Sequence, residues 1–144
     1  MSNNYIRDIH DNNRLSKNID YKNNDEHPIF AFQYITTNKD HNINYFKKRV
    51  RDKCKAYSSM FHKIDLMERT SWKELFNADK NKGIESINIS QVKFRPNSLK
   101  QVSNDQKVLV VRFNREKYRM IGIKEKNVFQ VIGFDFNYKA YNHG

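Results

Sequence analysis

With 144 residues, the chain is long enough for one domain around a single hydrophobic core. Its 27 lysines and arginines outnumber 16 aspartates and glutamates, and the formal net charge of +11 predicts a polyanion, an acidic protein or an anionic surface as partner, with nucleic acid ranked first. The sequence shows no secretory signal pattern and no apolar run near the roughly 20 residues of a membrane span. We therefore expect a soluble cytoplasmic protein without a membrane partner.

The sequence contains a single cysteine, Cys54. One cysteine excludes an intramolecular disulfide and a cysteine-rich zinc site, which also fits a cytoplasmic protein. Because Cys54 falls on the apolar positions of a helical pattern, we expect it to pack in the core rather than to act as a nucleophile.

The first 26 residues differ in composition from the rest of the chain. They are rich in asparagine and aspartate, and their apolar residues are isolated and follow no sustained period. Residues 1–28 hold four basic and five acidic side chains, so the excess positive charge belongs to the remainder. We expect residues 1–26 to form a mobile polar extension and residues 27–144 to form a basic α+β domain.

The first elements of this domain are a strand and a long helix. Ile29–Ile35 is an aromatic and β-branched run that predicts a strand. A helical apolar period then predicts one long amphipathic helix that begins near Asp40 or Asn42, with a basic outer face. Its apolar positions are Ile43, Phe46, Val50, Cys54, Tyr57, Met60, Phe61 and Ile64.

A short helix and four extended segments complete the expected elements. Ser71 and Glu74 have the spacing of a capping box and predict the start of a second, short helix. Residues 84–94 alternate irregularly and indicate a strand or an irregular extended segment. Three clearer strands, Lys107–Phe113, Tyr118–Lys124 and Val128–Asp135, are joined by connections short enough for hairpins. The order predicts an α+β fold in which a long and a short helix pack on a small antiparallel β-sheet.

The alternation of these strands predicts where two arginines point. Val108, Val110 and Arg112 share one face of the first strand of this meander, and Arg119 shares a face with Ile121 on the next. Both arginines lie near the connection between the two strands, so we expect a positive groove there.

Several segments of this chain carry a resemblance to known proteins. They are Pro28-Ile-Phe-Ala-Phe, Thr70-Ser-Trp-Lys-Glu74, Ile87-Asn-Ile-Ser90, Arg119-Met-Ile-Gly122, Val128-Phe and the terminal stretch from Asp135 to Tyr141-Asn-His143. Together they resemble a group of uncharacterised small bacterial and phage-associated proteins placed near the RelE/ParE toxin superfamily. The element order, the basic sheet and the aromatic tail with its histidine resemble that superfamily itself. The resemblance implies a RelE-like fold, a toxin that cuts RNA, and an acidic antitoxin as partner.

Such RNA cleavage needs a base for the 2′-hydroxyl, cations for the charge of the phosphorane and an acid for the leaving 5′-oxygen. No metal or other cofactor is required. We expect His143 or Tyr141 to transfer protons and Asp135 to orient His143 or a basic partner. The expected nucleic-acid-binding residues are Arg112, Arg119, Lys139, Tyr138, Lys47, Lys48, Arg51 and Lys55.

The sequence supports other kinds of functional site less well. His62 and Asp65 share a helical face, but a pair of ligands without a third is a weak metal site. The scattered glycines exclude a P-loop. Among the aromatic residues that could stack on bases, we expect Phe136 and Tyr138 to be exposed. The core is expected to contain Phe113, Phe129 and Phe134.

A second interpretation is a non-enzymatic protein of phage or mobile-element origin. It would use the same basic surface to bind nucleic acid or to inhibit a nucleic-acid-handling enzyme. Because binding alone needs no proton transfer, Tyr141 and His143 would then be replaceable. The helix cations would matter instead, namely Lys47, Lys48, Arg51 and Lys55.

Overall fold

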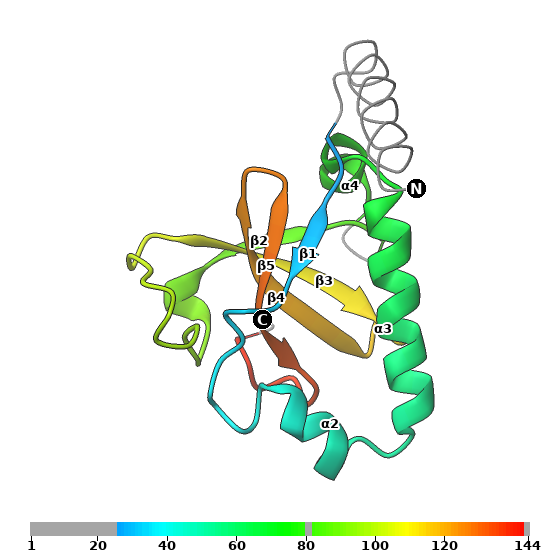
Figure 1. Cartoon of the computed structure of the whole chain (residues 1–144), viewed down its shortest axis with the longest axis vertical. Coiled ribbons are helices and arrows are strands. Elements are labelled where there is room, and N and C mark those ends of the chain that lie inside the picture. The colour runs from blue at the N-terminus through cyan, green and yellow to red at the C-terminus, as the bar shows by residue number, and fades with distance from the viewer. Residues whose placement is uncertain (1–25, 80–81, 143–144) are drawn as a thin grey trace, which may run out of the picture.

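The strands of the computed structural model form one five-stranded sheet with the order β1-β5-β4-β3-β2 (Figure 1). Its strands are β1 (Ile29–Ala31), β2 (Glu85–Asn88), β3 (Lys107–Phe113), β4 (Tyr118–Glu125) and β5 (Val128–Asp135). The structure describes residues 26–79 and 82–142. The expected polar extension lies, apart from Glu26, outside the described residues, and so does His143. The fold class is α+β, as predicted.

The sheet is mixed, so the prediction of an antiparallel sheet was wrong. β2, β3, β4 and β5 pair antiparallel, and short connections join β3 to β4 and β4 to β5. In contrast, β1 pairs parallel to β5, with Ile29 opposite Val128. β1 is also shorter than the predicted strand. Beyond it the chain still follows β5, because Thr36 donates a backbone hydrogen bond to Ile132 and Phe134 donates one to His41.

The predicted long helix is two helices, α2 (Ile43–Arg49) and α3 (Lys53–Glu68). Val50 leaves helical geometry while its side chain stays buried, and Asp52 then caps α3 by accepting a hydrogen bond from the Lys55 backbone at 3.1 Å. The continuous apolar period conceals this interruption because both helices face the same core.

The restart of the helix changes which residues are buried. The buried residues of α3 are Ala56, Met60, Ile64 and Met67. Cys54 is exposed, so the prediction that it packs in the core was wrong. Phe61 is also exposed, although it belongs to the predicted apolar face.

The short helix α4 (Trp72–Asn77) begins where the Ser-x-x-Glu spacing predicted. The Ser71 side chain accepts a hydrogen bond from the Glu74 backbone at 3.1 Å, which satisfies one of the free N–H groups of the first turn. Residues 84–94 divide into β2 and a 3-10 turn, η1 (Ile89–Gln91).

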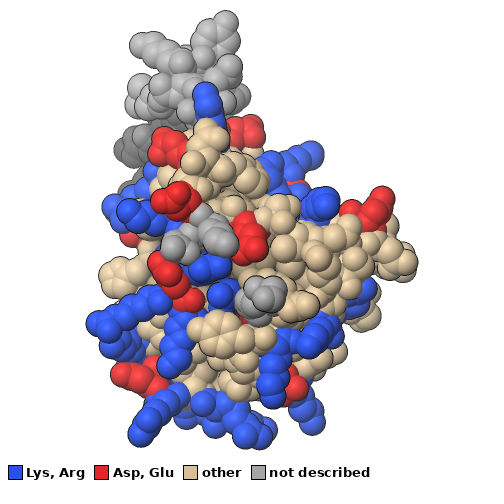
Figure 2. Space-filling model, turned by 180° about the vertical axis from the view of Figure 1, so that it is seen from behind, with Lys and Arg blue, Asp and Glu red and all other residues tan. Residues whose placement is uncertain are grey.

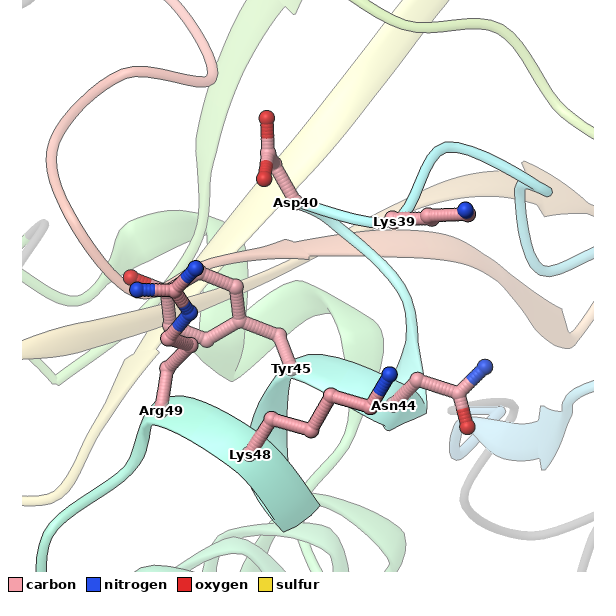
Figure 3. A pocket seen from close by; sticks show the side chains of 6 residues that line it. All are labelled: Lys39, Asp40, Asn44, Tyr45, Lys48 and Arg49. Carbon is pink, nitrogen blue, oxygen red and sulfur yellow. The ribbon is translucent and has the colours of Figure 1, made fainter.

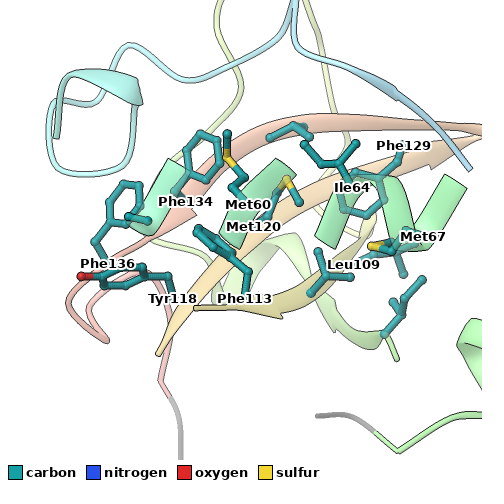
Figure 4. Close-up of a cluster of buried hydrophobic side chains, with 14 of the residues drawn as sticks. Met60, Ile64, Met67, Leu109, Phe113, Tyr118, Met120, Phe129, Phe134 and Phe136 are labelled. Carbon is teal, nitrogen blue, oxygen red and sulfur yellow. The ribbon is translucent and has the colours of Figure 1, made fainter. Parts of the chain in front are cut away.

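Each face of the sheet carries its own hydrophobic cluster, because strand side chains alternate. The helix-side cluster contains Leu109, Val111 and Phe113 of β3 together with residues of α2, α3 and α4 (Figure 4). The opposite cluster contains Val108 and Val110 with residues of η1 and of the segment after β5. The predicted alternation of β3 and β4 is therefore confirmed. Phe113, Phe129 and Phe134 are buried as predicted, but Phe136 is buried as well, contrary to the prediction.

One end of the sheet brings several segments together. Phe113 ends β3 opposite Tyr118 at the start of β4, and Asp135 ends β5 opposite Arg119. α2 packs at the same end, since the Phe46 and Phe136 rings are in edge contact at 4.3 Å. The described part of the chain contains no helix long and apolar enough to cross a membrane.

Candidate active site

The centre of the candidate site is a pair of arginines on neighbouring strands. Arg112 of β3 and Arg119 of β4 are direct partners in the antiparallel register. Side chains at such positions start about 4.5–5.5 Å apart, and like charges placed directly opposite each other are destabilising. The two predicted arginines therefore lie together, on the sheet face opposite the helices.

Arg119 is buried, with 5% of its surface exposed. Its guanidinium lies over the ring of Tyr138, 4.9 Å from the ring centre. The Nε and Nη1 atoms of Arg119 have no hydrogen-bond acceptor among the described residues. Because a buried cation costs free energy unless acceptors surround it, this arrangement favours an anion as ligand.

Tyr138 is held in an uncommon backbone conformation. Its φ of 61° lies in the left-handed region, and its side chain is exposed as predicted. Such conformations cost about 1–3 kcal/mol and cluster at functional sites. Tyr138 thus covers Arg119 from the solvent side and offers an aromatic surface beside it.

Glu85 of β2 is a member of the cluster that the sequence analysis missed. Its Oε2 lies 3.9 Å from Arg112 Nη2, which is a long ion pair. The β2–β3 register places Glu85 opposite Val110 and so on the same sheet face as Arg112. The alternation of apolar and polar residues around Ile84 indicated an extended segment. It did not show which residue of β3 lies opposite Glu85.

Asp135 is fully buried and holds the segment that follows β5. Its Oδ1 accepts backbone hydrogen bonds from Lys139 at 3.1 Å and from Asn137 at 3.3 Å. In the sheet it is the partner of Arg119. The described contacts thus assign Asp135 to shaping the turn beside Arg119, and its predicted contact with His143 lies outside the described residues.

Tyr141 is buried and belongs to the cluster on the sheet face opposite the helices. It forms a β-bridge with Val92, and Lys93 donates a backbone hydrogen bond to Ala140 at 2.8 Å. The sequence analysis placed Tyr141 in the aromatic tail after the last strand and did not predict that it is buried. Backbone pairing with residues 92 and 93 thus anchors Tyr141 and the residue before it.

The environment of Tyr141 favours its protonated form. Burial raises the pKa of its hydroxyl above the ordinary value, and the positive charge of Arg119 partly opposes this rise. The carboxylates of Glu85 and Asp135 raise the pKa of Tyr141 further. A phenol with a raised pKa is protonated at neutral pH, and the protonated form can serve as the acid of a cleavage reaction but not as its base.

The remaining predicted nucleic-acid contacts are all exposed. Lys139 follows Tyr138, Lys47 and Lys48 lie on α2, Arg51 lies between the helices, and Lys55 lies on α3. Lysine and arginine side chains gather at the lower end of the molecule in Figure 2, the end at which Figure 1 places α2. The structure thus groups Arg112, Arg119, Asp135, Tyr138 and Tyr141, whereas the helix cations form a separate, solvent-facing set.

Comparisons with known proteins identified no relative of this chain. No protein-family model matches the chain, and no similar curated protein or solved structure was found. Among the described residues, no group of three or more histidine, cysteine, aspartate or glutamate side chains lies close enough to hold a metal ion. The functional argument therefore depends on the arginine cluster and its surroundings.

Proposed function

We propose that this chain is a RelE-like toxin, a metal-independent endoribonuclease acting on RNA. The observation that carries the proposal is the buried Arg119, which lies opposite Arg112 and whose Nε and Nη1 atoms lack an acceptor in the described part of the chain. A phosphodiester supplies the oxygens that such a pair can bind. The order strand, helices and three-stranded meander supports the RelE-like assignment of the fold.

The proposed reaction transfers the phosphoryl group to the neighbouring sugar oxygen. The 2′-oxygen attacks phosphorus and gives its proton to a base, the bond from phosphorus to the 5′-oxygen breaks, and an acid protonates that 5′-oxygen. The products are a 2′,3′-cyclic phosphate and a 5′-hydroxyl. Arg112 and Arg119 stabilise the extra negative charge of the phosphorane, as fixed cations do in a water-excluded site.

Tyr141 serves as the acid in this proposal, because its hydroxyl stays protonated beside Arg119. His143 is the proposed base, by its sequence position two residues further on. Tyr138 and Lys139 contact the RNA next to the scissile phosphate. The acidic antitoxin expected from the resemblance would neutralise the exposed cations around this site.

A growth experiment combined with an RNA assay tests the proposal. Expression of the chain from a tightly controlled promoter should arrest growth, and the purified protein should cut RNA to fragments with 2′,3′-cyclic phosphate ends. Arg119→Met should abolish both effects, because Met keeps an unbranched apolar stem but removes the guanidinium and its charge. Arg69→Met is the matched control, since Arg69 is exposed at the C-terminus of α3 and pairs with Asp65.

The alternative function predicts a different pattern. The exposed cations of α2 and α3 favour a protein that binds nucleic acid, or inhibits an enzyme that handles it, without chemistry. In that case RNA stays intact while binding persists in Arg119→Met and fails after charge reversal at Lys48 and Arg51. Intact RNA together with normal growth on expression contradicts the toxin assignment.

A further inference from the structure

A pocket of about 250 Å³ lies along α2 and the loop before it (Figure 3). Its walls come from two residues of the loop and four residues of the helix. The lining residues are Lys39, Asp40, Asn44, Tyr45, Lys48 and Arg49.

The charge of this pocket favours an anionic ligand. Lys39, Lys48 and Arg49 are exposed cations, and Asp40 is the one carboxylate among the lining residues. Three cations around so small a volume attract a phosphate group more strongly than the same charges spread over a surface, because the walls of a concavity focus the field.

Tyr45 gives the pocket an aromatic wall. One face of its ring stacks on Phe136, with 5.2 Å between ring centres and 11° between planes. Phe136 is itself buried, so the Tyr45 ring is fixed from behind, while the residue as a whole is only half-buried. A fixed ring bordering a pocket is a stacking surface for a nucleobase, and the Asn44 amide beside it can hydrogen-bond a base edge.

The pocket and the arginine cluster lie at the same end of β5. Asp135 pairs with Arg119, and the next residue, Phe136, supports Tyr45. Neighbouring side chains of an extended chain point in opposite directions, so the two features lie on either side of the chain where β5 ends. A single strand that passes around this end can occupy both.

We propose that this pocket binds one nucleotide of single-stranded RNA, with its base on Tyr45 and its phosphate at Lys48 and Arg49. The assignment of RNA as the ligand rests on the proposed function. The pocket then holds a nucleotide flanking the scissile phosphate, and its contribution is to substrate affinity rather than to chemistry. Tyr45→Ala should therefore raise KM and leave kcat unchanged.

Binding is measured separately from cleavage with a fluorescent 2′-O-methyl RNA octamer, which lacks the attacking hydroxyl. Tyr45→Ala should weaken its binding about tenfold, since base stacking on an aromatic residue contributes about 1–3 kcal/mol. Tyr45→Phe keeps the stacking ring and should bind normally. Circular dichroism of each variant checks that the contact with Phe136 is not needed for folding. If Tyr45→Ala unfolds, the comparison of Lys48→Glu with Lys47→Glu tests the pocket instead.

A charge comparison within α2 gives the matched control. Lys48→Glu removes a pocket cation, whereas Lys47→Glu makes the same charge change at an exposed neighbour outside the pocket. Lys48→Glu should weaken binding of the octamer at least tenfold more than Lys47→Glu. Equal losses overturn the proposal and leave a diffuse basic surface.

Competition defines the ligand. Uridine 5′-monophosphate should displace the octamer from the pocket better than inorganic phosphate does, and Tyr45→Ala should remove that difference. Equal competition by both overturns the nucleotide assignment. If the chain cuts no RNA and these binding results still hold, the ribonuclease proposal fails and the pocket stands. If cleavage continues with an unchanged KM in Tyr45→Ala, the pocket fails and the ribonuclease stands.

Discussion

Tyr141 joins packing and proposed chemistry in one side chain. Tyr141→Phe keeps the buried ring and removes only the hydroxyl, so we expect kcat for RNA cleavage to fall by about 10²–10⁴-fold, the usual contribution of an acid–base group, with little change in KM. Single-turnover cleavage measures the rate of the chemical step, and thermal unfolding measures the stability of the variant. A variant that unfolds normally and cuts at the normal rate contradicts the role of Tyr141 as the acid.

The raised pKa of Tyr141 also predicts a pH dependence of stability. In the folded chain the phenol ionises at higher pH than in the unfolded chain, so the unfolded state loses its proton first. The stability contributed by this group is therefore complete below the ordinary tyrosine pKa of about 10 and is lost as pH rises through the folded pKa. Urea unfolding at a series of pH values from about 8 to about 11 measures this loss. The free energy of unfolding should decline less steeply with pH for Tyr141→Phe than for the native chain.

Gly133 is a position where the backbone approaches a ring closely. An added Cβ would lie 2.4 Å from Cε2 of Phe94, which packs over this glycine from the loop side. Gly133→Ala should therefore destabilise the fold by about 1–3 kcal/mol, as overpacking does. Chemical denaturation measures the loss, and the double variant with Phe94→Leu should recover part of it. Full stability of Gly133→Ala would mean that the Phe94 ring moves aside at no cost.

Single residues show what the sequence could and could not predict about the site. The period of two grouped Arg112 with Val108 and Val110, and Arg119 with Ile121, but the register that makes the two arginines direct partners was not predictable. It could not supply Glu85, since that side chain enters the cluster through the register between β2 and β3. It also misplaced Phe136, whose burial depends on α2 packing against the end of β5.

Among the elements, the interruption between α2 and α3 depends on a single cap. Asp52→Ala should destabilise the chain by about 0.5–2 kcal/mol, because the Lys55 backbone N–H loses its acceptor. Asp52→Asn is the control, since asparagine caps a helix as well as aspartate does. Urea midpoints that are equal for Asp52→Ala and Asp52→Asn contradict this reading of the cap.

The interruption was hidden in the sequence for a physical reason. Val50 remains buried after helical geometry ends, so the apolar spacing continues without a gap. Lys107–Phe113 and Val128–Asp135, in contrast, were predicted with their observed ends, because polar connections border each strand. Apolar periodicity identifies segments that face a core, but it does not show whether the helix is continuous between its apolar positions.

For the whole molecule, the charge predicts how binding depends on salt. The affinity for single-stranded RNA should fall with a log–log slope of about −0.7 for each phosphate neutralised. Joint charge reversal of Lys47, Lys48 and Arg51 should reduce the magnitude of that slope by roughly 0.7 for each of these cations that contacts a phosphate. Fluorescence anisotropy over a salt series measures it. A slope near zero would remove nucleic acid as the partner.

The topology of the whole sheet was only partly within reach of the sequence. Short connections made the antiparallel meander predictable, since a hairpin leaves its strands little choice of neighbour. No such local signal exists for β1, which pairs with β5 across most of the chain. The half-buried Phe30 contacts Phe129 across this pair, with 5.0 Å between ring centres, and such a long-range contact leaves no trace in local composition.

The pairing of β1 with β5 also has a consequence for how the protein is made. Ile29 finds its partner Val128 only after the ribosome has added all the residues between them. At about 5–20 residues per second, synthesis of that stretch takes on the order of 5–20 s. During this time β1 lacks its partner strand, so the nascent chain presents an early hydrophobic segment to chaperones until β5 emerges.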